Sequence, residues 1–194
     1  MKSLPKMVLA AFFTGLMVAG ALLAIPFPGV PLVIVNAFPW LAALLLGPLW
    51  AGVSTGLYLL LGAFGLPVFA KGAAGVGVLF GTTGGFLAGY LLSALVVGWL
   101  RDPAGKNLVR TCLAAAAGLV TVYLAGIPWL AFVAFKGTDG FQAGNLVQAV
   151  FWATGPAAAP FLFVVGDGVK AVAVIVAARM LVQVPGVASL FTKK

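Results

Sequence analysis

Long apolar segments follow one another along the chain, separated by short breaks that contain proline, glycine or charged residues. Within each segment the apolar residues are continuous rather than alternating, which favours helices over half-exposed strands. A helix needs about 20 mostly apolar residues to cross a membrane. We predict six such helices, over Met7–Ile25, Leu32–Leu46, Leu49–Phe64, Thr83–Leu100, Leu108–Phe135, and from Trp152 or Ala157 to Val182.

The segment from Gly65 to Gly81, between the third and fourth predicted helices, is apolar but contains too many glycines for a stable helix. Non-helical backbone is tolerated at membrane depth only where it is buried in protein or lines a cavity. We therefore expect a re-entrant lid or wall of a binding site, with a long surface loop as the alternative.

Composition supports a membrane location. Hydrophobic residues make up 63% of the 194 residues and charged residues 7%, whereas about a quarter of the residues in a soluble domain are charged. We expect an all-α integral membrane protein, and the six helices leave no room for a soluble domain. Residues 1–194 should therefore form a single membrane domain.

The net charge of +8 at first suggests a nucleic-acid partner, but the basic residues are scattered among apolar runs. We expect membrane lipid around the chain and no nucleic acid. Cytoplasmic loops carry an excess of Lys and Arg, and six spans with both termini in the cytoplasm satisfy that rule. The cytoplasmic side would then receive Lys2, Lys6, Arg101, Lys106, Arg110, Arg179, Lys193 and Lys194, and the outer side Lys71 and Lys136.

The residues needed for several kinds of site are absent from the sequence. The chain has no His, one Cys and three acidic residues, so we expect no metal site, no disulfide framework, no cofactor and no Ser–His–Asp catalysis. The phosphate-binding loop of ATPases is also missing from the sequence. Any energy input must come from elsewhere.

Ionisable residues inside apolar spans are costly and usually functional. Asp167 and Lys170 lie three residues apart in the last span, so on a helix they share a face and can neutralise each other. A structural ion pair is one interpretation. We favour a binding site, because such pairs give doubtful net stability and because a buried acceptor beside a buried donor suits a ligand that carries both N–H and C=O groups.

Three further positions are candidates for ligand contact. Asn36 is the only amide in the first four spans, and a hydrogen bond between helices explains it as well as a ligand does. Tyr123 could stack on a ligand. Thr83 belongs to the Thr-Thr-Gly-Gly start of the fourth span, where free N–H groups favour anions.

The first span carries a stripe of small residues, Ala11, Gly15 and Ala19, at successive i+4 positions. Such stripes let helix backbones approach closely in a membrane. The stripe suits a partner membrane protein, and packing within this chain is the open alternative.

Four motifs in order along the chain resemble the BioY family, the biotin-specific substrate-binding (S) components of energy-coupling factor (ECF) transporters. The resemblance covers nearly the whole chain. The motifs run from Leu46-Gly47-Pro48 to Tyr58, from Gly65 to Ala70, from Gly81 to Phe86, and through Gly166-Asp167-x-x-Lys170. One departure is Lys71, which stands where the family's Gly-rich loop has a glycine.

The resemblance implies a six-helix S-component fold in a prokaryotic plasma membrane. It implies biotin bound near the outer face and, as partners, a membrane scaffold (T component) and two ATPases. Ala11 and Gly15 match positions that meet the scaffold, and Asn36 with the Asp167–Lys170 pair matches positions of the vitamin pocket. Phe69 and Tyr123 would hold apolar parts of the vitamin, with Lys71 and Thr83 also at the site.

The expected function is therefore uptake of biotin, without enzymatic activity. The rival within transport is lipoate or another acyl-tailed vitamin. Rivals from other classes are a membrane-embedded enzyme, which would have to use Asp167 and Lys170, and a small channel or structural subunit.

Overall fold

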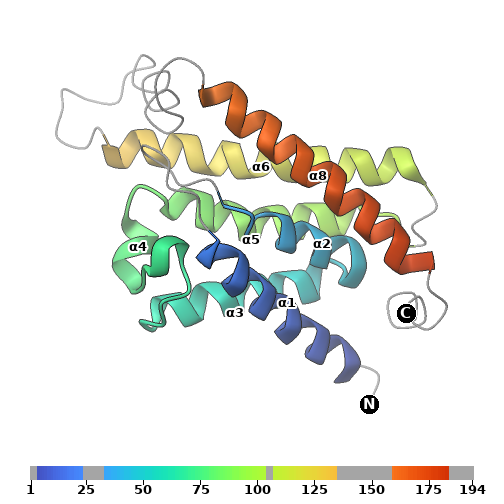
Figure 1. Cartoon of the computed structure of the whole chain (residues 1–194), viewed down its shortest axis with the longest axis horizontal. Helices are drawn as coiled ribbons and strands as arrows, with labels where there is room; N and C mark the ends of the chain where they lie inside the picture. The colour runs from blue at the N-terminus through green and yellow to red at the C-terminus, as the bar shows by residue number, and fades with distance from the viewer. Residues whose placement is uncertain (1–3, 24–32, 104–106, 135–158, 184–194) are drawn as a thin grey trace.

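The computed structural model describes residues 4–23, 33–103, 107–134 and 159–183, and all regular structure in these ranges is helical (Figure 1). The chain is therefore all-α, as predicted. In chain order the elements are α1 (Leu4–Leu22), α2 (Ala37–Leu46), α3 (Pro48–Ala63), the short 3₁₀ helix η1 (Ala70–Gly72), α4 (Val76–Phe80), α5 (Gly84–Leu100), α6 (Leu108–Ala134) and α8 (Ala159–Gln183).

The six predicted helices correspond to α1, α2, α3, α5, α6 and α8, mostly within a few residues. The prediction for α2 is wrong at its start, because residues 33–36 form an irregular turn in which the N–H of Ala37 donates to the Ile34 carbonyl at 3.0 Å. Three β-branched residues in a row explain the late start, since β-branching lowers helix propensity. The predicted limits Leu32, Ile25, Phe135 and Trp152 or Ala157 lie outside the described residues.

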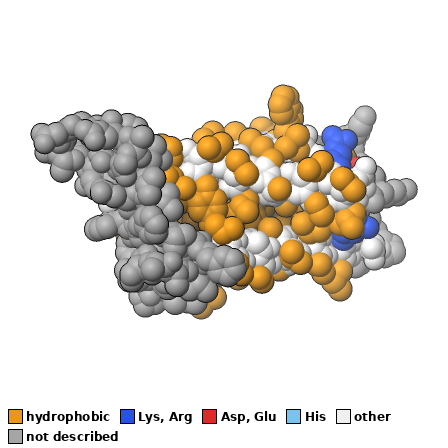
Figure 2. Space-filling model, turned by 90° about the horizontal axis from the view of Figure 1, so that it is seen from above, with side chains coloured by type: hydrophobic (Ala, Val, Ile, Leu, Met, Phe, Trp, Pro, Cys, Tyr) orange, Lys and Arg blue, Asp and Glu red, His pale blue; other side chains and the backbone are white. Residues whose placement is uncertain are grey.

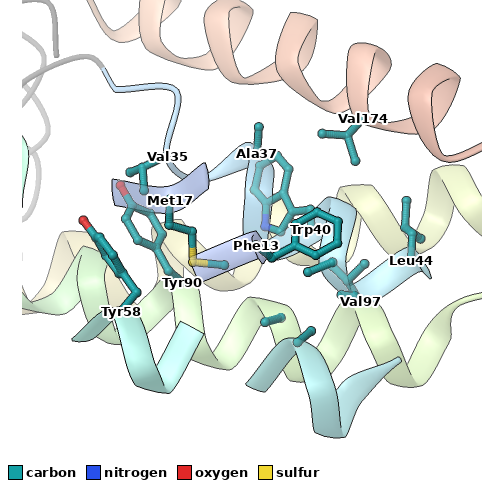
Figure 3. Close-up of a cluster of buried hydrophobic side chains, with 14 of the residues drawn as sticks. Phe13, Met17, Val35, Ala37, Trp40, Leu44, Tyr58, Tyr90, Val97 and Val174 are labelled. Atoms are coloured by element: carbon teal, nitrogen blue, oxygen red, sulfur yellow. The ribbon is translucent and has the colours of Figure 1, made fainter. Parts of the chain in front are cut away.

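Helix α2 is the centre of the bundle. It contacts α1, α3, α5, α6 and α8, and in Figure 1 it lies between α1 and α3 on one side and α8 on the other. Its Trp40 is fully buried, and its indole N–H donates to Ser93 Oγ on α5 at 3.1 Å. Phe13, Val97 and Val174 bring α1, α5 and α8 into the same cluster (Figure 3). This packing fixes the position of the turn that precedes α2.

The turn between α2 and α3 is held by Arg101, the residue after α5. Its Nη1 donates to the carbonyls of Leu44 and Leu45, at 3.1 and 2.6 Å, at the C-terminal end of α2, where a cation is favoured. Gly47 has φ +91°, and a Cβ there would lie 2.9 Å from the guanidinium. Glycine is therefore needed on both conformational and steric grounds.

The outer surface is apolar. Figure 2 shows hydrophobic side chains over the body of the molecule and Lys and Arg at one end, and large residues such as Leu113, Leu124 and Val172 are exposed. By length and hydropathy, α1 and residues Leu108–Val133 of α6 can each cross a membrane. A soluble particle rarely exposes so much apolar surface, so these features indicate a membrane protein.

The Gly-rich segment 65–81 folds back onto the end of α3. It contains η1 and the five-residue α4, so the expectation of non-helical backbone is met only outside these two short helices. The N–H of Gly75 donates to the Gly62 carbonyl at 2.7 Å, and the Phe69 ring packs edge-on against Tyr58 with centroids 5.6 Å apart. The segment therefore packs against α3.

Candidate functional site

The carboxylate of Asp167, on α8, is the centre of a buried polar cluster. Only 7% of this residue is exposed. Its Oδ1 accepts hydrogen bonds from Lys170 Nζ at 2.7 Å and from Asn36 Nδ2 at 2.9 Å, and its Oδ2 accepts one from the Tyr123 hydroxyl at 2.8 Å. Three candidates from distant parts of the sequence thus meet at one carboxylate.

The irregular turn before α2 contributes to this cluster in two ways. Lys170 Nζ donates to the Val33 carbonyl at 2.7 Å, which is available because α2 begins only at Ala37. Asn36 is 4% exposed, and its Oδ1 is buried with no hydrogen-bond partner among the described residues. A buried acceptor without a partner costs about 1–3 kcal/mol, so this oxygen is a candidate to accept from a ligand.

A cavity of about 190 Å³ lies beside the cluster. Its walls are mostly apolar and come from the turn before α2, from α3, from segment 65–81 and from the start of α5. The residues that line it are Val33, Val35, Tyr58, Phe69, Ala70, Lys71, Ala73, Val78, Thr83, Phe86, Leu87 and Tyr90. Small-molecule sites combine an apolar lining with a few polar groups in this way.

The cavity and the cluster share the turn before α2. Val33, whose carbonyl accepts from Lys170, and Val35, the neighbour of Asn36, both line the cavity. In Figure 3 the hydroxyls of Tyr58 and Tyr90 point the same way, toward the side of Val35. A ligand in the cavity would therefore meet these hydroxyls and lie next to the cluster.

The seven candidate residues divide between these two places. Phe69, Lys71 and Thr83 line the cavity, whereas Asn36, Asp167 and Lys170 belong to the cluster together with Tyr123. Tyr123 does not line this cavity. Its hydroxyl is bonded to Asp167, and its ring lines a separate apolar groove with Ile127, Pro128 and Val164.

Sequence reasoning missed Tyr58 and Tyr90 as cavity residues. The signal was present, because a hydroxyl inside an apolar span is unusual for the same reason as the amide of Asn36. Trp129 on α6 contacts the same region: its indole N–H donates to the Gly81 carbonyl at 2.8 Å, beside the cavity wall that carries Thr83.

Comparison with known families identifies the chain. The model of the BioY family matches residues 1–186. The chain belongs to the BioY family. The resemblance recognised from the four sequence motifs is therefore confirmed.

Two proteins that are named biotin transporters of the BioY family are similar to this chain over much of their length. The biotin transporter BioY of Thermotoga maritima is 38% identical over 122 residues, which are 63% of this chain and 72% of that protein. The probable biotin transporter BioY of Pyrococcus horikoshii is 35% identical over 89% of this chain and 93% of its own. These BioY relatives are named transporters, in agreement with the expectation that the chain is not an enzyme.

A solved structure supports the fold. The crystal structure of the S-component for biotin from an ECF-type ABC transporter superimposes with a TM-score of 0.78, over 97% of this chain and 96% of that chain, at 24% identity. At that identity the similarity concerns the fold. The BioY chain described here therefore has the all-helical fold of an ECF S component, as predicted.

Proposed function

We propose that this chain is the substrate-binding membrane subunit of a biotin uptake system. The observation that carries the proposal is the buried cluster around Asp167 beside a mostly apolar cavity. The names of the BioY relatives support biotin as the ligand, and the proposed site residues are Asn36, Phe69, Lys71, Thr83, Tyr123, Asp167 and Lys170.

The chemistry of biotin suits this arrangement. Its ureido ring offers two N–H donors and one C=O acceptor, and the rest of the molecule is an apolar bicycle and tail that ends in a carboxylate. A carboxylate has about four acceptor positions, of which Asp167 uses three. The remaining one and the free Oδ1 of Asn36 can accept the two N–H groups, while Lys170 can donate to the C=O.

The cavity is smaller than most small-molecule sites, which measure about 300–1,000 Å³. An outward movement of one wall would enlarge the cavity. Segment 65–81 is the wall with the weakest regular structure, and a Cβ added at Gly65, Gly72 or Gly75 would meet no atom within 4 Å. We propose that this re-entrant segment makes room for the vitamin.

The proposed membrane arrangement is a single domain over residues 1–194 with six spans in the plasma membrane of a prokaryote and both termini in the cytoplasm. Lys6, Arg101, Arg110 and Arg179 lie near helix ends that gather at one end of the molecule (Figure 1). Lys71 lies with η1 near the other. This distribution supports a cavity close to the outer face.

The proposed partners are an ECF scaffold, the T component, and two ATPases that supply the energy. Ala11, Gly15 and Ala19 are exposed on α1, whereas the opposite face of that helix buries Ala10, Phe13 and Met17. A Cβ at Gly15 would meet no atom within 4 Å. The small-residue stripe is therefore available to a second membrane protein.

Titration of the purified protein with biotin and with lipoate tests the proposed ligand. We expect sub-micromolar binding of biotin, one molecule per chain, and weaker binding of lipoate, which has no ureido group to pair with Asn36 and Asp167. Sub-micromolar lipoate binding without biotin binding would replace biotin by an acyl-tailed vitamin.

A further inference from the structure

The backbone at Lys71 has an unusual conformation. With φ 60° and ψ 24°, Lys71 has the left-handed conformation, and it is the one non-glycine residue with positive φ among the described residues. The surrounding turn holds it there, because the N–H of Phe69 donates to the Ala73 carbonyl and the N–H of Gly72 to the Phe69 carbonyl, at 3.1 and 3.0 Å. Glycine adopts this conformation without strain, so what lysine adds at this position is its charged side chain.

Lys71 is one of the residues that line the cavity of the proposed binding site. It is exposed, and it is the only basic residue among the described residues that line the cavity. Its ammonium has no hydrogen bond or ion pair within the described part of the chain. Asp167 and Lys170, by contrast, neutralise each other at 2.7 Å. The site as a whole therefore has one uncompensated positive charge, at the wall formed by segment 65–81.

We propose that Lys71 forms an ion pair with the ionised carboxylate of the ligand. The site would therefore bind a free acid more tightly than a neutral ester or amide. The inference rests on the proposed function, in which the ureido ring meets the cluster of Asn36 and Asp167. A ligand with its ring there would direct its tail along the apolar lining. Its terminal carboxylate would then reach the free ammonium.

The strength of this contact follows from its exposure. Ion pairs open to water contribute little, since solvent and salt screen them. Lys71 is also long and flexible and binds a carboxylate as a point charge rather than as a rigid fork. We therefore expect selectivity of about threefold to tenfold for the free acid, which falls as salt is raised.

The test compares biotin with biotinamide, in which a neutral amide replaces the carboxylate, on the purified full-length protein. The wild type should bind biotin about threefold to tenfold more tightly than biotinamide. The variant Lys71→Gly relieves the backbone strain and should fold at least as well. Its affinity for biotin should fall to the level of its affinity for biotinamide, and the affinity for biotinamide should not change. Lys71→Arg should keep most of the selectivity.

Two results separate this inference from the proposed function. Equal binding of both compounds to the wild type, or unchanged selectivity in Lys71→Gly, would overturn the role of Lys71 and leave biotin as the ligand. Binding of neither compound to a folded wild type would overturn the proposed function and the role of Lys71 with it.

Discussion

Three donors converge on the carboxylate of Asp167, and two of them come from outside α8, one from the turn before α2 and one from α6. A purely structural ion pair would need only Lys170. The ion pair contributes little net stability once the cost of desolvation is counted. The cluster also leaves Asn36 Oδ1 buried with no hydrogen-bond partner among the described residues. These two costs are easier to explain if the cluster is completed by a ligand.

Replacing Asp167 by Asn tests this role. The new amide N–H₂ group would face donors where the wild type has an acceptor, and Lys170 would lose its counter-charge. We expect biotin binding to weaken more than tenfold, about 1.4 kcal/mol or more, in a protein that still inserts and folds. Titration in detergent gives the affinity, and size exclusion with a melting curve reports the fold.

Thr55→Val is a matched control for removal of a buried polar group. Thr55 is fully buried, but among the described residues its hydroxyl bonds only to the Ala51 carbonyl one turn earlier in α3, and it is not one of the residues that line the cavity. Binding should be retained in this variant. If binding instead also persists unchanged in Asp167→Asn combined with Lys170→Met, the pair is structural and the site lies elsewhere.

For single residues, the sequence predicts contacts between residues that are close along the chain and misses contacts between residues that are far apart along it. The Asp167–Lys170 pair follows from a separation of three residues on one helix face. Asn36 and Tyr123 could be recognised as unusual polar residues. That both bind Asp167, across 131 and 44 residues of sequence, depends on the packing of α2, α6 and α8.

Between helices, α5 and α6 come together around Trp129. Its indole donates to the Gly81 carbonyl at 2.8 Å. A Cβ added at Gly85 would overlap the Trp129 side chain, and one at Gly84 would overlap the Leu79 carbonyl. Gly85 therefore lets α6 approach the start of α5, and Gly84 lets the Leu79 carbonyl of α4 approach it. The hydrogen bond of Trp129 ties the wall that carries Thr83 to α6.

Trp129→Phe removes the N–H donor and keeps an aromatic ring. A net hydrogen bond contributes about 0.5–1.5 kcal/mol, so we expect biotin binding to weaken about twofold to tenfold because the Gly81–Thr83 wall is less well held. Isothermal titration provides the measurement. Trp99→Phe is the control, because Trp99 is 82% exposed on α5 and should leave binding unchanged. An unaffected Trp129→Phe would mean that the helix packing alone holds the wall.

The positions of the helices were predictable from the sequence, because they follow from the length of each apolar segment and from the Gly and Pro residues at its ends. The limits of α3 and α5 differ by at most one residue from those predicted. The start of α2 was not predictable by apolar length, because Val33 and Ile34 are as apolar as a helix requires. Their carbonyls are used in tertiary contacts and turns instead.

For the whole molecule, the lining of the cavity and the small-residue face of α1 are formed by different residues, although α1 packs against η1 of segment 65–81. The cavity is lined from α3, α5, segment 65–81 and the turn before α2, with no lining residue from α1 among the described residues. Ligand binding and partner assembly should therefore be separable by mutation, which a single shared surface would not allow.

Ala11→Leu combined with Gly15→Leu tests this separation. Helices in lipid associate largely through close packing, so bulky side chains on the exposed stripe should push a partner helix away. We expect biotin affinity within about threefold of wild type, under ~0.7 kcal/mol, while assembly with the scaffold and ATPases, and the uptake they drive, falls sharply. Co-purification and uptake of labelled biotin measure the two effects.

The matched control places the same side chains on other lipid-facing positions, Ala88→Leu on α5 with Ala116→Leu on α6, both of which are exposed alanines. Because the bulk added is similar, this variant should assemble and transport normally if α1 alone carries the contact. Loss of biotin binding in the α1 variant would instead mean that the stripe packs within this chain. Normal transport by the α1 variant would place the partner on another face, and failure of the control alone would point to α5 and α6.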